Sequence, residues 1–159
     1  MRVRFTKMHG AGNDFVLIDD RDGAFPCQRE VLAKIGARQM GVGCEGIILV
    51  QESDRADFRM RFFNPDGSEA ELCGNGARCV AAFAREIGAA KSDAMRFETL
   101  AGDVGAEIAG AGLVKIAARR VADAGMWREI KSTFKTMPPI MRYGKSFGWS
   151  VQRVIVPMF

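Results

Sequence analysis

A helix that is apolar on nearly every side is the feature of this sequence that most restricts its fold. Residues 76–87 are rich in helix formers, include the apolar run Cys79 to Ala84, and are followed by Gly88, which ends the helix. A helix without a polar face has to be buried. Strands are predicted before and after it at 3–8, 15–19, 46–52, 58–63, 95–99, 104–108 and 113–117, and a second helix at 28–39. We therefore predict an α/β (α+β) fold in which a curved sheet wraps around a buried central helix.

A polar turn precedes this helix and places a cysteine at its start. Pro65, Asp66 and Gly67 have strong turn chemistry, because proline presets φ, aspartate bonds its own backbone and glycine accepts positive φ. Cys73 then lies where the helix begins, directly before Gly74-Asn75-Gly76. The unpaired N–H groups and the dipole of a helix start favour an anion, which here is a thiolate or a bound carboxylate.

The other cysteines and the single histidine do not suggest a metal site. Four cysteines with no C-x-x-C pair and one histidine make a poor zinc or redox set, so no metal is predicted. Cys79 lies on the apolar surface of the helix and is interpreted as a core residue. Cys27 and Cys44 lie in or before loops and are interpreted as incidental free thiols. His9, beside a glycine-rich turn, is expected to have a structural hydrogen-bonding role.

Two long motifs resemble the signature of the diaminopimelate epimerase family. The first is the run from Asn64 to Arg78, and the second is Met8 to Asp19; the connecting segments 41–46 and 57–63 agree with it in the same order. The resemblance covers residues 1–117. It implies a half-barrel domain and a cofactor-independent epimerase of lysine and cell-wall precursor synthesis. Such an enzyme interconverts LL- and meso-diaminopimelate by moving one α-proton, without pyridoxal phosphate as an electron sink.

This chemistry explains the residue types that the resemblance places in the site. A base is needed on one face of the α-carbon, an acid on the other, and dipoles must face the carboxylate as charge develops. The resemblance implies that Cys73 is one of two acid/base thiols. It also implies that the backbone N–H groups of Gly74 and Asn75 hold the α-carboxylate. The side-chain amides of Asn13 and Asn64 are implied to contact the substrate. Gly46 stands where many relatives carry glutamine, and Arg78 is interpreted as a brace for the turn.

The composition changes near residue 117. Up to that residue there are 15 Lys and Arg against 17 Asp and Glu, and from Ala118 onward there are 8 against 2. We interpret 1–117 as the family's N-terminal domain and 118–159 as a divergent or out-of-frame tail, with the family's C-terminal domain and its partner cysteine absent. A genuinely divergent domain end is the alternative. Because the positive charge belongs to this tail and shows no motif, nucleic-acid binding is not predicted.

No apolar stretch of about 18 residues and no leading basic-plus-apolar signal occurs, so no membrane partner is predicted and a cytoplasmic location is expected. The expected partner is a small-molecule amino-acid substrate, with a possible homodimer. Without a second catalytic cysteine, this chain alone is expected to be inactive. Two alternatives stay open: a related cofactor-independent racemase or isomerase of the same fold, and a non-catalytic truncated domain.

Overall fold

The computed structural model describes residues 2–110, 112–118 and 152–157. These residues form nine strands and two helices. The elements, in chain order, are β1 (Arg2–Gly10), β2 (Asn13–Asp19), α1 (Arg29–Gly36), β3 (Gly46–Gln51), β4 (Phe58–Phe63), β5 (Glu69–Ala70), α2 (Gly74–Glu86), β6 (Ala94–Thr99), β7 (Gly102–Ile108), β8 (Val114–Ala118) and β9 (Gln152–Pro157).

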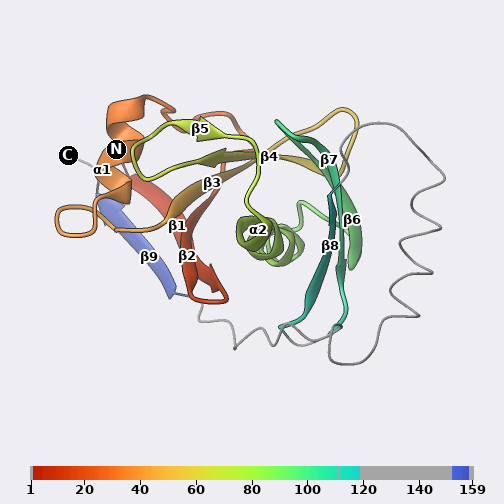
Figure 1. Cartoon of the computed structure of the whole chain (residues 1–159). Helices are drawn as coiled ribbons and strands as arrows, with labels where there is room; N and C mark the ends of the chain where they lie inside the picture. The colour runs from red at the N-terminus through yellow and green to blue at the C-terminus, as the bar shows by residue number, and fades with distance from the viewer. Residues whose placement is uncertain (1, 111, 119–151, 158–159) are drawn as a thin grey trace.

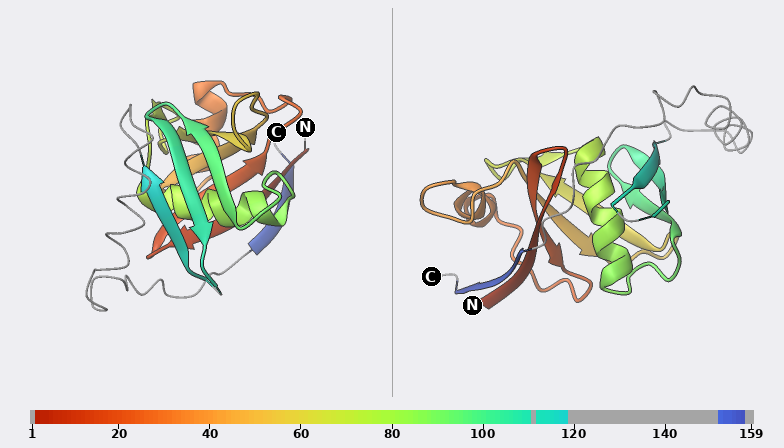
Figure 2. Two further views of the ribbon diagram at one scale, coloured as in Figure 1. Left: turned by 90° about the vertical axis from the view of Figure 1, so that its right-hand side faces the viewer. Right: turned by 90° about the horizontal axis from the view of Figure 1, so that it is seen from below.

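All of the strands belong to one mixed sheet with the order β8-β7-β6-β4-β3-β2-β1-β9, and the short β5 pairs with β4. Neighbouring strands are antiparallel except in two places, where β2 pairs with β3 and β4 pairs with β6 in parallel. The sheet curls so that β1 and β2 face β6, β7 and β8 across α2, which is seen end-on in Figure 1. The view from below in Figure 2 shows α2 between the same two groups of strands. The predicted curved sheet around a central helix is confirmed.

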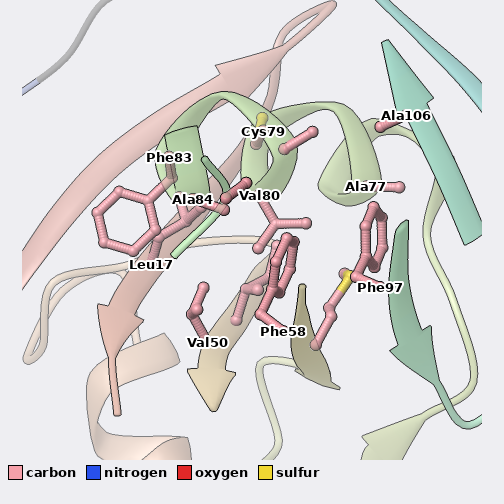
Figure 3. Close-up of a cluster of buried hydrophobic side chains, with 14 of the residues drawn as sticks. Leu17, Val50, Phe58, Ala77, Cys79, Val80, Phe83, Ala84, Phe97 and Ala106 are labelled. Atoms are coloured by element: carbon pink, nitrogen blue, oxygen red, sulfur yellow. The ribbon is translucent and has the colours of Figure 1, made fainter. Parts of the chain in front are cut away.

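The inner core explains why α2 is held inside the curve. Its buried residues include Cys79, Val80 and Phe83, and they belong to one cluster with side chains from β2, β3, β4 and β6. Figure 3 shows this cluster, with Val80 of α2 near Phe58 and Phe97 of the sheet. The rings of Phe58 and Phe97 stack with centroids 4.8 Å apart. The prediction that the helix is buried is confirmed, although α2 begins at Gly74, two residues earlier than expected.

A second core lies on the outer face of the sheet. Along β2, Phe15 and Leu17 belong to the inner cluster, whereas Val16 and Ile18 belong to the outer one, as alternation along a strand requires. The outer cluster is covered by α1, which contributes buried Leu32 and Ile35. The expected helix at 28–39 was too long, since α1 ends at Gly36. Met40, which continues the helical spacing of apolar residues in this segment, is 93% exposed.

The hairpin between β1 and β2 sets one wall of the region around the start of α2. Its two central residues, Ala11 and Gly12, both have positive φ, at 56° and 89°, as a two-residue hairpin of the primed type requires. A Cβ atom on Gly10 would lie 3.1 Å from the backbone oxygen of Asn75. Glycine at this position therefore lets the hairpin approach α2 closely and brings Asn13, the first residue of β2, to the same place.

The boundary proposed at residue 117 falls inside β8, whose last residue, Ala118, pairs with Val104 of β7. Most of the tail, residues 119–151 and 158–159, lies outside the described residues. Beyond Ala118, the described part of the tail is β9, which pairs with β1 in antiparallel register, with Arg2 opposite Pro157 and Lys7 opposite Gln152. The division into a domain and a foreign tail stays a prediction.

Candidate active site

Cys73 lies at the N-terminal cap of α2, as the sequence predicted for it. Its backbone is extended, with φ −125° and ψ 122°, and its side chain makes no capping hydrogen bond. The first turn of the helix contains no acidic residue, and a Cβ atom on Gly74 would meet nothing within 4 Å. A helix start of this kind offers backbone N–H groups and positive potential to an anion. The helix geometry thus places a half-buried thiol directly beside a site suited to a carboxylate.

The side chain of Asn13 contacts both Cys73 and Asn75 at this point. The Sγ atom of Cys73 lies 3.6 Å from Oδ1 of Asn13, and Nδ2 of Asn75 lies 3.4 Å from the same oxygen. Cys73 and Asn75 come from the start of α2, whereas Asn13 comes from the hairpin, about 60 residues earlier in the chain. The structure therefore brings together three of the five residues that the sequence assigned to the site, with Gly74 adjacent in the chain.

Asn64 is placed differently. It begins the polar turn after β4, where its backbone N–H donates to the carbonyl of Ser68 at 2.8 Å. Its side-chain Nδ2 donates to Oγ of Ser68 at 3.1 Å. Gly36 packs closely on this turn, since a Cβ atom there would lie 2.5 Å from the backbone oxygen of Pro65. The described contacts of the Asn64 amide thus hold the turn, and its role toward a substrate stays a prediction.

A group of charged residues adjoins Asn13 and was missed by the sequence reading. The carboxylate of Asp14 pairs with Nζ of Lys7 and with the Arg38 guanidinium, both at 3.0 Å. Burial alone raises the pKa of Asp14, but hydrogen bonds and charges from Arg38 and Lys7 outweigh it and lower the pKa below its usual value. Glu45 pairs with Arg38 at 3.5 Å and accepts a hydrogen bond from Nδ2 of Asn13. The side chain of Asn13 is therefore held by an ionic network on one side and faces Cys73 on the other.

The remaining cysteines are less suited to acid/base chemistry. Cys79 is fully buried, which raises the pKa of its thiol to about 12, and its interpretation as core is confirmed. Cys44 is a free thiol in the loop before β3, as expected, but it is 1% exposed and belongs to the outer core. Burial raises its pKa. Cys27 packs partly against the same outer cluster, and burial raises its pKa more than the neighbouring Arg61 lowers it.

Arg78 donates a hydrogen bond to Oδ1 of Asn75 within the first turn of α2, and its interpretation as a brace for the preceding turn stays a prediction. The expected hydrogen bonding of His9 fails at Nδ1, which is buried without a partner in the described part of the chain. At Gly46 a Cβ atom would lie 2.4 Å from the ring of Phe62. A larger residue at this position therefore requires Phe62 to move.

The geometry predicts an order of thiol reactivity. At neutral pH iodoacetamide should modify Cys73 first, Cys27 more slowly, and Cys44 and Cys79 last, because a buried thiol is both inaccessible and reluctant to ionise. The helix start adds about 0.3–1 kcal/mol in favour of a thiolate at an exposed site. Peptide mapping after a short reaction measures the order. The control is the chain unfolded in urea, in which the four cysteines should react at similar rates. Faster labelling of Cys27 than of Cys73 in the folded chain would contradict the prediction.

Neither helix in the described part of the chain is long and apolar enough to cross a membrane.

The fold is shared with several solved structures. A phenazine biosynthesis protein of the PhzF family from Bacillus anthracis superposes with a TM-score of 0.56 at 27% identity, over 73% of this chain and 40% of that one. A hydroxyproline epimerase from Agrobacterium vitis shares the fold with a TM-score of 0.53 at 18% identity, over 75% of this chain and 38% of that one. The curled half-barrel sheet with a central helix is thus the fold of these proteins.

Sequence similarity then identifies the family. The model of the diaminopimelate epimerase family matches residues 5–123. Diaminopimelate epimerase from Archaeoglobus fulgidus is 49% identical over 111 residues, which are 68% of this chain and 39% of that protein. The enzyme from Acetivibrio thermocellus is 46% identical over 100 residues, which are 63% of this chain and 36% of that protein. This chain belongs to the diaminopimelate epimerase family, and it spans less than half the length of these relatives.

Proposed function

We propose that this chain forms one half of the active site of a cofactor-independent epimerase that interconverts LL- and meso-diaminopimelate. Cys73 is the acid/base thiol that this half contributes. The backbone N–H groups of Gly74 and Asn75 hold the α-carboxylate of the substrate, and the amides of Asn13 and Asn64 contact the substrate. The observation that supports the proposal is the position of Cys73, a half-buried thiol at an uncapped helix start beside the amide of Asn13.

Each part of this site matches a demand of the reaction. Removing an α-proton from an amino acid leaves negative charge that spreads onto the carboxylate, and donors fixed beforehand around that carboxylate stabilise it. The start of α2 supplies such donors without an acidic residue nearby. A thiol suits the proton transfer because it exchanges its proton near neutral pH. No metal or organic cofactor is assigned a step in this mechanism.

The proton that returns to the opposite face of the α-carbon needs a second donor. Cys79 is buried beneath the site, and Cys44 and Cys27 belong to the cluster on the other face of the sheet. None of the three is placed to act opposite Cys73. We therefore propose that the second thiol comes from outside the residues of this chain, in a second domain or a partner chain.

The alternative of a related racemase or isomerase rests on the shared fold, since proteins of that kind are among the structural neighbours. The similarity in sequence, however, is to diaminopimelate epimerases over most of the described domain. A cytoplasmic location and a homodimer remain proposals, the first supported by four unpaired cysteines, which suit a reducing compartment.

Substrate protection tests the proposed function. LL- or meso-diaminopimelate at millimolar concentration should slow alkylation of Cys73, because the bound carboxylate and α-carbon cover the thiol. Labelling of Cys27 provides the internal control and should not change. Proline and hydroxyproline at the same concentrations distinguish the racemase alternative. Protection by one of these and not by diaminopimelate would replace the proposed substrate, and equal labelling with every amino acid would support the non-catalytic domain.

A further inference from the structure

The hydrogen bonds beside Cys73 have a defined direction. Four side chains form a continuous series: Arg78 contacts Asn75, Asn75 contacts Asn13, and Asn13 contacts Glu45. The two inner members are amides, each of which can donate through nitrogen or accept through oxygen. An amide of this kind can in principle face either way, so its direction has to be set by its neighbours.

The two ends of the series leave no such choice. Ionised Glu45 can only accept hydrogen bonds, so Asn13 must present Nδ2 to it. The guanidinium of Arg78 can only donate, so Asn75 must present Oδ1 to it. With both ends set, Nδ2 of Asn75 faces Oδ1 of Asn13, at 3.4 Å. All three hydrogen bonds then run in one direction, from Arg78 to Glu45.

This direction determines what Cys73 meets. The carbonyl oxygen of Asn13, and not its NH₂ group, is turned toward Sγ at 3.6 Å. An acceptor in that position binds the protonated thiol, S–H, and is unfavourable next to a thiolate. The start of α2 has the opposite preference, because it favours a thiolate. The two effects act on the same sulfur from different sides.

The acceptor end is itself held in place. Glu45 is 52% exposed, but its backbone N–H donates to the carbonyl of Asp14 at 2.8 Å, and its carboxylate pairs with Arg38. Asp14 follows Asn13 in β2, and its own carboxylate also binds Arg38 at 3.0 Å. Residue 45 is therefore tied to the strand that carries Asn13 by its backbone and through a shared arginine. These ties reduce the conformational freedom that an exposed side chain loses when it binds.

We propose that Glu45 and Arg78 are positioning residues that set the direction of the Asn75–Asn13 amide pair, so that the carbonyl oxygen of Asn13, and not its NH₂ group, faces the sulfur of Cys73. The proposal rests on the proposed function only where it treats Cys73 as an acid/base group. Its test measures thiol reactivity in the full chain without substrate. A failure of the epimerase proposal and a failure of this one are therefore distinguishable.

Rates of Cys73 alkylation in single and double variants test the proposal. Glu45→Ala and Arg78→Met each remove one end, and the other end still orients the amides. With both removed, the Asn13 amide can turn its NH₂ group to the sulfur and favour the thiolate. The double variant should react faster than the product of the two single effects by about 2- to 10-fold, the equivalent of one hydrogen bond.

A purely through-space charge effect gives a different pattern. Loss of the Glu45 charge then speeds the reaction, loss of the Arg78 charge slows it, and the double variant equals the product of the singles. That result would overturn the proposal. Glu45→Asp keeps a carboxylate that can only accept, so combined with Arg78→Met it should restore multiplicative behaviour. The matched control is Glu107→Ala with Lys115→Met. These two side chains form an exposed ion pair, with Nζ of Lys115 3.6 Å from the Glu107 carboxylate, and removing it should leave the rate unchanged.

A second measurement keeps Arg78 in place in case its loss impairs folding. In the chain labelled with ¹⁵N-asparagine, the side-chain NH₂ signal of Asn13 should shift on Glu45→Gln, and that of Asn75 on Arg78→Lys. Signals are assigned by their loss in Asn13→Ala and Asn75→Ala. If the Asn13 signal does not respond to the change at Glu45, the carboxylate does not hold that amide and the proposal is wrong.

Discussion

Incubated with LL-diaminopimelate in deuterated water, this chain should exchange the α-hydrogen without forming the meso isomer. In the proposed mechanism the thiolate of Cys73 takes the α-proton and becomes a thiol, whose proton exchanges with solvent deuterium. The deuteron then returns to the same face of the carbanion, so the configuration is retained. Inversion needs a second acid on the opposite face, and the three other cysteines are buried or lie on the outer side of the sheet.

The size of this effect follows from the contribution of one proton donor. A positioned acid or base accelerates proton transfer by about 10²–10⁴-fold, and inversion should be slower than exchange by at least this factor. Mass spectrometry follows deuterium uptake, and chiral chromatography follows the meso isomer. Cys73→Ala should abolish the exchange, whereas Cys27→Ala, a change at another partly buried thiol, should leave it unaltered. Production of the meso isomer by the unmodified chain, lost in Cys73→Ala, would show that a second donor is present.

The local parts of the site could be predicted from sequence because they depend on neighbouring residues. The turn at 65–68, the helix that follows it and the place of Cys73 at the helix start all come from short-range chemistry, and each is found in the structure. The burial of α2 followed from its apolar surface. Asn13 required the family resemblance, since nothing within its own segment indicates a contact with a residue 60 positions later.

The charged network could not be predicted because strand pairing creates it. The parallel pairing of β2 with β3 places Phe15 opposite Gly46, and this register brings Glu45 beside Asn13 and Asp14. A single sequence does not show which strands are neighbours. The outer core was missed for a similar reason: Cys44 precedes β3 in a segment with loop composition, yet it packs under α1 in the folded chain. The second helix was predicted too long because the helical spacing of apolar residues continues past the point where α1 ends.

Replacing Phe58 with alanine should strongly destabilise the domain and with it the site. Phe58 and Phe97 are both fully buried and stacked, and they belong to the cluster that supports α2 (Figure 3). Removal of a buried phenylalanine costs about 3–5 kcal/mol, through lost transfer free energy and the cavity that remains. A domain of this size has a free energy of unfolding of only about 5–15 kcal/mol, so the variant should unfold at a much lower urea concentration.

The same variant links the core to the chemistry of Cys73. The thiol owes its proposed reactivity to the start of α2, and the inner cluster fixes that helix against the sheet. If Phe58→Ala loosens this packing, the difference in alkylation rate between Cys73 and the buried Cys79 should shrink well below the urea midpoint of the parent chain. Leu100→Ala is the matched control, because Leu100 is 61% exposed and surface changes of this kind alter stability by about 0.5 kcal/mol or less. Phe58→Ala would contradict this account if it left both the urea midpoint and the labelling of Cys79 unchanged, since α2 would then be held by contacts other than this core.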